Sequence, residues 1–205
     1  MNCITLKESN DEDLLAQYFA GDVRAFIALY ERHKGPMFRY FLRHVKDGQI
    51  AEDLLQDLWS KIISHGDSFV ADAKFSTWAY TIARNKLIDH GRHLQVRQTV
   101  IDDVVESEEI ENAQHGQAAL PAEADDELTR MRQKQAISNC LEKLPSHLLD
   151  VFLLKEEGDM SGQQISEVID ISYEATKSRL RYAYQQLRTC LQQKLKIHGS
   201  LGEQS

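Results

Sequence analysis

Residues 75–93 read FSTWAYTIARNKLIDHGRH, and their spacing is that of one long amphipathic helix. A helical wheel gathers the apolar side chains into one broad arc, formed by Phe75, Ala79, Ile82, Ala83 and Leu87. The other side is polar and basic, with Trp78 at its boundary, and holds Thr77, Thr81, Arg84, Asn85 and Arg92. A core helix, a membrane-surface helix and a helix that handles nucleic acid all fit this composition. Asn85 and Asp89 disfavour the lipid interface, where a helix needs a wider uninterrupted apolar face.

Helical spacing of apolar residues extends on both sides of this stretch. It runs from Asp11 to His93 and returns from Leu128 onward. Breaks are expected at Gly21-Asp22, Gly35-Pro36 and Asp47-Gly48. We find no alternating strand pattern of any length. The sequence therefore predicts an all-α protein made of two small helical domains.

Acidic residues are concentrated between the two helical halves. The net charge of the chain is −8, yet residues 95–127 hold ten Asp and Glu against one Arg, so this segment alone carries −9. The remainder sums to about +1, with basic clusters at residues 74–97 and 173–196. Low aromatic content and the lack of a clean period predict a flexible linker. We expect domains at residues 1–94 and 128–196, an acidic linker at 95–127 and a tail at 197–205.

Membrane-spanning, secreted and catalytic classes find no support in the sequence. No apolar run approaches the roughly 20 residues that cross a bilayer, and the N-terminus lacks a signal-peptide pattern. Cys3, Cys140 and Cys190 are widely scattered, which predicts a reducing compartment and argues against a disulfide framework. His90 and His93 have no acidic or cysteine partner at ligand spacing, so we expect no metal site. No triad, nucleophile elbow or phosphate loop occurs, so we expect neither an enzyme nor a cofactor.

Residues 160–188 read MSGQQISEVIDISYEATKSRLRYAYQQLR and have the layout of a helix-turn-helix. Ser161 is placed to cap the first helix and Ser172 to cap the second. A tight turn is expected at Asp170-Ile171-Ser172, with Ile171 in the core. In the second helix the inward stripe is formed by Thr176, Leu180, Ala183, Leu187 and Leu191. Such a helix fits the major groove of DNA while its inner stripe anchors it; the alternative is an amphipathic hairpin with a solvated basic face.

Three motifs in order resemble the extracytoplasmic-function (ECF) group of alternative RNA polymerase sigma factors of the sigma-70 family. They are AEDLLQDLW at residues 51–59, FSTWAYTIARNKLIDHGR at 75–92 and LEKLPSHLLDVFLLKEEGDMSGQQISEVIDISYEATKSRL at 141–180. The resemblance covers roughly Asp11–His93 and Leu128–Leu195. It implies a sigma-2-like helical bundle and a sigma-4-like helix-turn-helix domain. It also implies a protein that binds core RNA polymerase, directs promoter-specific initiation by recognising −35 and −10 elements, and helps to open the −10 DNA.

The resemblance assigns polymerase docking to the helix at residues 51–59. With its apolar stripe turned inward, the outer face presents Glu52, Asp53, Gln56 and Asp57. In the family this helix docks on the basic clamp helices of the β′ subunit, and the β subunit is a further partner. Acidic and amide side chains suit such a surface, although an ordinary solvated helix face is the alternative.

The resemblance gives residues 66–92 the task of opening the −10 element and holding an unstacked base of the non-template strand. Aromatic faces stack on bases, and basic side chains hold the backbone. The candidate −10 contacts are Lys74, Trp78, Arg84, Asn85 and Arg92. Phe75 and Ile82 are expected in the core.

The second helix of the helix-turn-helix is expected to read the −35 element. The candidate contacts are Ser172, Tyr173, Lys177, Ser178, Arg179, Arg181 and Arg188. The sequence departs from the family pattern here, because Glu174-Ala175 replaces a small-residue/Thr pair and Tyr182 and Tyr184 stand where Arg is common. These departures remove phosphate contacts and add a charge that phosphates repel. We therefore expect an unusual −35 site or weaker binding to it.

The resemblance further implies promoter DNA and an anti-sigma factor as partners. It places the protein in the cytoplasm, on the nucleoid within the holoenzyme, or at the membrane through an anti-sigma factor without insertion of its own. The acidic linker is expected to thread toward the active-site and RNA-exit channels of polymerase. The residues leave two other interpretations open: a stand-alone DNA-binding regulator whose N-terminal half serves dimerisation or sensing, and a helical adaptor that binds only proteins.

Overall fold

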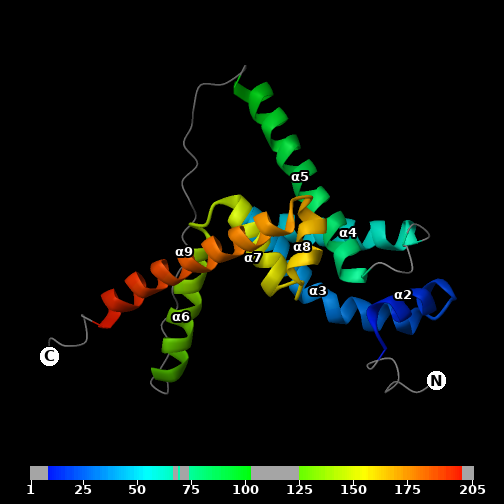
Figure 1. Ribbon diagram of the computed structural model, residues 1–205. Coiled ribbons are helices and arrows are strands. Elements are labelled where there is room, and N and C mark those ends of the chain that lie inside the picture. Colours follow the sequence, from blue (N-terminus) through cyan, green and yellow to red (C-terminus); the bar gives the residue numbers. More distant parts are fainter. Residues whose placement is uncertain (1–8, 67–68, 70–73, 103–124, 200–205) are drawn as a thin grey trace. The chain divides into compact units, whose positions relative to one another are not determined.

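The computed structural model describes residues 9–66, 69, 74–102 and 125–199, and each regular element in these ranges is an α-helix. In chain order (Figure 1) they are α2 (Asp11–Phe19), α3 (Val23–Val45), α4 (Gly48–Ser64), α5 (Phe75–Asp102), α6 (Asp125–Leu141), α7 (Ser146–Glu156), α8 (Gly162–Ile169) and α9 (Tyr173–Gly199). The all-α class is confirmed. The chain divides into two compact units: Met1–Asp89 with Leu144–Gln186, and His90–Lys143 with Leu187–Ser205.

Helices α2, α3 and α4 begin where the sequence supplies a capping side chain. Asn10, Asp22 and Asp47 each accept a hydrogen bond from a backbone N–H of the first turn, at 2.7, 3.0 and 3.0 Å. These bonds satisfy donors that a first helical turn leaves without an intrahelical partner. Helix α3 ends at Lys46, which takes the left-handed conformation with φ of 57°. Two of the three expected breaks are thereby confirmed.

The break expected at Gly35-Pro36 is wrong, because α3 continues through it from Val23 to Val45. A proline inside a helix costs about 3 kcal/mol, since its ring removes a backbone donor and crowds the preceding turn. Packing on both sides of Pro36 outweighs this cost. The side chains that flank it without exposed surface are Leu29, Met37, Tyr40 and Phe41. Tertiary burial therefore overrides the local breaker signal.

The helix-turn-helix formed by α8 and α9 is confirmed, together with both of its expected caps. Ser161 Oγ accepts the Gln164 N–H at 3.3 Å, and the Gln164 side chain accepts the Ser161 N–H at 2.9 Å, which makes a capping box. Asp170 takes the left-handed conformation at the end of α8, and Ser172 Oγ accepts a backbone N–H of α9 at 3.2 Å. Ile171 in the turn is half-buried. The buried inward positions are Ile165, Val168, Ile169, Thr176, Ala183 and Leu187.

Helix α5 is longer than the sequence indicates. It continues to Asp102, so residues 95–102 of the expected linker are helical. Likewise, α6 begins at Asp125, within the segment assigned to the linker. Residues 103–124 lie outside the described part of the chain, and the flexible-linker expectation for them stays a prediction.

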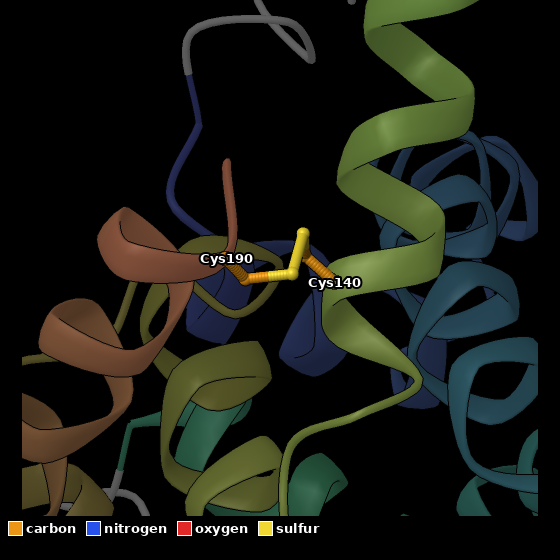
Figure 2. Close-up of a disulfide and its surroundings, with 2 residues drawn as sticks. All are labelled: Cys140 and Cys190. Atoms are coloured by element: carbon orange, nitrogen blue, oxygen red, sulfur yellow. A yellow bond between two sulfur atoms is a disulfide. The ribbon is translucent and has the colours of Figure 1, made fainter. Parts of the chain in front are cut away.

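A disulfide joins α6 to α9, so the expectation against disulfides is wrong. Cys140, in the last turn of α6, is bonded to Cys190 of α9, and their Cα atoms are 5.8 Å apart (Figure 2). The two residues are separated by 50 positions and belong to no short-spaced motif. The spacing of the cysteines in the sequence therefore does not indicate that the fold brings these two together. The third cysteine, Cys3, lies outside the described residues.

Replacing Pro36 with Ala is expected to raise the free energy of unfolding by about 1–3 kcal/mol, since it restores a helical N–H donor and removes the ring. Glu31→Ala, at an exposed position of the same helix, is the matched control and is expected to change stability by less than about 0.5 kcal/mol. Urea unfolding followed by far-UV circular dichroism measures both. A less stable Pro36→Ala variant would show that the proline geometry itself is needed to place the second half of α3.

Candidate functional site

The outer face of α4 presents all four side chains predicted for polymerase docking, and all four are exposed: Glu52, Asp53, Gln56 and Asp57. The opposite face is buried through Ala51, Leu54 and Leu58. Lys86 of α5, which the sequence did not single out, pairs with Asp57 at 3.0 Å. Helix α4 therefore offers an acidic face with a basic neighbour at one edge.

The start of α5 is held by α2 and carries an aromatic cluster. Glu12 Oε1 accepts the Phe75 N–H at 2.9 Å and lies 3.9 Å from Lys74 Nζ. Trp78, one turn later, is half-buried, and its ring centroid lies 5.3 Å from that of Phe69 and 6.3 Å from that of Phe75. Phe75 has no exposed surface, as expected for a core residue. The cluster leaves part of the Trp78 ring accessible.

The remaining predicted −10 contacts on α5 differ in their exposure. Asn85 and Arg92 are exposed, whereas Arg84 is half-buried. Ile82, expected in the core, is half-buried as well. Most of the predicted loop at residues 66–74 lies outside the described part of the chain.

Arg84 is bound to a carboxylate that the sequence analysis did not single out. Its Nε donates to Asp150 Oδ2 of α7 at 2.9 Å. The Tyr40 hydroxyl donates to the other carboxylate oxygen at 2.8 Å, and His44 Nε2 lies 3.7 Å from that oxygen. One acidic side chain of the second helical half therefore gathers three polar groups from α3 and α5. No local sequence pattern indicates this cluster, because Arg84 and Asp150 are 66 positions apart.

Burial raises the pKa of two tyrosines, Tyr40 of this cluster and Tyr80. Tyr40 has no exposed surface, and burial, followed by the charge and hydrogen bond of Asp150, raises its pKa well above the usual value of 10. Burial, followed by the charge of Glu157, also raises the pKa of Tyr80. Glu157 in turn accepts a hydrogen bond from Arg39 Nε at 2.7 Å. These contacts tie the end of α7 to α3.

The exposed face of α9 contains most of the predicted −35 contacts. Tyr173, Lys177, Ser178, Arg181 and Arg188 are exposed, Ser172 is exposed and caps the helix, and Arg179 is half-buried. Glu174 Oε1 lies 3.3 Å from Lys177 Nζ, so the unexpected acid partly neutralises one of these cations. Lys177 and Arg181 also lie over tyrosine rings, at 5.3 Å from Tyr173 and 5.2 Å from Tyr182.

Tyr184, the other departure from the family pattern, has a packing role. Its hydroxyl donates to Glu156 at the end of α7, and its ring lies 5.5 Å from that of Phe152. Burial and then the Glu156 hydrogen bond raise the pKa of Tyr184 to about 12. A side chain that could contact DNA in this position instead helps to hold α9 on α7.

Within the described ranges, no three His, Cys, Asp or Glu side chains gather as metal ligands would. Among the helices the structure describes, none has the length and apolar character needed to span a bilayer.

Comparison with known proteins identifies two matching family models. Sigma-70 region 2 matches residues 29–97, and Sigma-70, region 4 matches residues 134–187, so that together they cover more than half of the chain. The chain is 28% identical to the ECF RNA polymerase sigma factor SigL of Mycobacterium tuberculosis over 176 residues, which are 85% of this chain and 93% of that protein. It is 26% identical to the RNA polymerase sigma-H factor of Pseudomonas aeruginosa over 192 residues, 91% and 96% of the two chains.

A solved structure has the same fold. It is that of the sigma factor RpoE in complex with the anti-sigma factor NepR from Bartonella quintana, with a TM-score of 0.63. The match covers 83% of this chain and 98% of that one at 22% identity.

Alkaline pH is expected to destabilise the fold, and Tyr40 is expected to account for part of the loss. Because its folded-state pKa lies above the unfolded value of about 10, the stability linked to its proton is present below pH 10 and is lost as the pH rises further. Tyr40→Phe should therefore show a shallower loss of unfolding free energy above pH 10 than the unsubstituted chain.

Urea unfolding at a series of pH values from 8 to about 11 measures this slope. Tyr182→Phe, which alters an exposed ring, is the control. Equal slopes for the unsubstituted chain and Tyr40→Phe would contradict the assignment.

Proposed function

The chain belongs to the ECF group of the sigma-70 family, and from this premise we propose how its surfaces divide the work of promoter recognition. A sigma factor is a transcription initiation factor rather than an enzyme: it binds core RNA polymerase and directs it to promoters, and the polymerase supplies the chemistry. One observation supports the proposal most directly. The segment that matches region 2 contains the acidic face of α4, and the segment that matches region 4 contains the capped helix-turn-helix.

The two other interpretations lose their support. A stand-alone regulator would use its N-terminal half for dimerisation or sensing, but that half matches region 2. A protein-only adaptor would have no use for a region 4 helix-turn-helix. We assign residues 1–94 to polymerase docking and the −10 element, 128–196 to the −35 element and 95–127 to the linker between them, with a tail at 197–205.

Polymerase docking is assigned to Glu52, Asp53, Gln56 and Asp57 on α4. Their common exposure on a rigid helix, opposite a buried stripe, supports a preformed acidic surface for the basic β′ clamp helices. The ion pair between Asp57 and Lys86 is solvent-exposed at its acidic end and is worth at most about 1 kcal/mol, so a cation of the partner can replace Lys86 at little cost. The β subunit is the further polymerase contact.

The −10 element is assigned to Lys74, Trp78, Arg84, Asn85 and Arg92. The partly accessible Trp78 ring, supported by Phe69 and Phe75, is suited to stack on an unpaired base. Arg84 requires a further step, because a phosphate has to replace Asp150 as its acceptor. We therefore propose that DNA binding by Arg84 follows separation of α7 from α3 and α5.

The −35 element is assigned to Ser172, Tyr173, Lys177, Ser178, Arg179, Arg181 and Arg188. The exposed side chains of this set lie on α9 outside its buried stripe, as a helix in the major groove requires. Glu174 beside Lys177, and Tyr184 packed on α7, support the expectation of fewer phosphate contacts than in other members of the family.

We further propose an anti-sigma factor as the regulatory partner, since the similar Bartonella RpoE was solved with one. The protein would act in the cytoplasm, on the nucleoid within the holoenzyme, and reach the membrane only through that partner. The acidic linker would thread toward the active-site and RNA-exit channels of polymerase.

Reversing two charges on α4 tests the docking assignment. Asp53→Arg together with Asp57→Arg should lower core-polymerase affinity at least about 100-fold, because two attractive contacts become repulsive. Glu142→Arg together with Glu167→Arg makes the same change in net charge at exposed positions away from α4 and is the control. Fluorescence anisotropy of the labelled chain titrated with core polymerase measures the affinity. Full binding by the α4 variant would show that the docking face lies elsewhere.

Truncating Trp78 tests the −10 assignment. Trp78→Ala is expected to weaken binding of the holoenzyme to a single-stranded −10 oligonucleotide about 5- to 100-fold, the range for loss of one base–aromatic stack. Trp78→Phe should recover most of the affinity, since it keeps a stacking face. Thermal melts of each variant separate a folding defect from a binding defect, and unchanged affinity in folded Trp78→Ala would remove Trp78 from the site.

A further inference from the structure

The two bonded cysteines flank residues 160–188, the helix-turn-helix segment singled out in the sequence. Cys140 lies in the last turn of α6 and Cys190 on α9 (Figure 2). Cys140 is 1% exposed, whereas Cys190 is half-buried. The 50-residue span between them contains α7, α8 and the first part of α9. Every predicted −35 contact therefore lies inside the covalent loop that the disulfide closes.

The compartment in which a sigma factor works makes this bond unusual. Core polymerase operates in the bacterial cytoplasm, where thiol systems keep most disulfides reduced, and disulfides that do form there are usually transient or redox-sensing. We propose that Cys140 and Cys190 form a reversible thiol oxidation site, open under reducing conditions and closed by a peroxide or a small disulfide oxidant, that regulates the −35-reading domain. The regulatory consequence rests on the proposed function, but the thiol chemistry does not.

The exposure of the two cysteine residues indicates the order of the steps. With hydrogen peroxide, the Cys190 thiolate attacks one oxygen, the O–O bond breaks, and a sulfenic acid forms as one water leaves. The Cys140 thiolate then attacks the Cys190 sulfur, the S–O bond breaks, and a second water leaves as the disulfide forms. Two thiols lose two electrons and two protons, and the peroxide is reduced to two waters. Reduction runs through attack by an external thiolate on the sulfur of Cys190, the more exposed residue.

Few of the described side chains of α6 are buried, which is why the bond matters. Among residues 130–141, only Cys140 and Leu141 are buried, whereas Met131 and Ile137 are 56% and 45% exposed. On α9, Cys190 continues the inward stripe of Ala183 and Leu187 at helical spacing. Closing the bond therefore ties the last turn of α6 covalently to α9 at Cys190, and opening it leaves only non-covalent contacts there, with Cys140 and Leu141 as the buried side chains among residues 130–141. Oxidation should order α6 and fix the rotation of α9, whose outer face reads DNA.

The chemistry is tested on the full chain carrying Cys3→Ser, which leaves Cys140 and Cys190 as its only cysteines. The protein is equilibrated in glutathione buffers of increasing oxidised fraction, or treated with hydrogen peroxide, and free thiols are counted by a mass-tagged maleimide. We expect one two-thiol transition that reverses with dithiothreitol, and none in the additional variant Cys190→Ser. Thiols that stay free under peroxide, or a disulfide that persists in excess reduced glutathione, would overturn the proposal.

The effect of the disulfide on α6 and on transcription is tested by comparing oxidised and reduced protein in two measurements. Hydrogen exchange of α6 amides should be at least about tenfold slower in the oxidised chain, since local opening becomes rarer. Transcription at limiting holoenzyme, from a promoter selected by the reduced holoenzyme from a random DNA pool, should rise at least about threefold on oxidation through preorganisation of α9. The Cys190→Ser variant should match the reduced protein in both.

The outcomes separate this proposal from the assigned function. Failure of the reduced holoenzyme to select any promoter would contradict the sigma-factor function and leave the thiol and exchange results standing. Promoter selection with identical exchange and transcription in both redox states would overturn the regulatory role of the cysteine pair alone.

Discussion

Burial of an apolar stripe on α4 and on α9 fixes which of their side chains face solvent. On α4, Ala51, Leu54 and Leu58 turn inward, and the acidic residues between them have no orientation left but outward. The same constraint on α9, through Thr176, Ala183 and Leu187, presents its basic flank to solvent. The hydrophobic contacts thereby hold the exposed acidic side chains of α4 and the exposed basic side chains of α9 in place.

A second constraint acts between the two helical halves through Asp150. Its carboxylate accepts hydrogen bonds from Arg84 and Tyr40 and is largely buried. Removing one partner of such a pair leaves a buried charge or polar group unsatisfied. The elements named −35 and −10 are about 25 base pairs apart, or about 85 Å at 3.4 Å per base pair. Under the proposed assignment of the two elements, helices in direct contact would not reach both, and promoter binding would exchange the Arg84–Asp150 contact for contacts with DNA and polymerase.

The sequence predicted those features that depend on neighbours within a helix turn. Caps at Ser161 and Ser172, the exposed acids of α4 and the buried Phe75 follow from local spacing, and the structure confirms each. Partnerships across long separations carry no local signal, which is why the Arg84–Asp150 pair and the Cys140–Cys190 bond were missed. The uninterrupted α3 was missed for a related reason, because the burial that outweighs Pro36 depends on the whole core.

As a sigma factor, this chain confers promoter specificity on core RNA polymerase. The direct measurement is run-off transcription from a random DNA pool with core polymerase alone and with core polymerase plus the purified chain, followed by sequencing of the templates used. We expect the chain to co-elute with core polymerase and to enrich templates that share two elements upstream of a common start site. A chain that binds duplex DNA tightly by itself, yet neither associates with core polymerase nor changes the templates used, would contradict it.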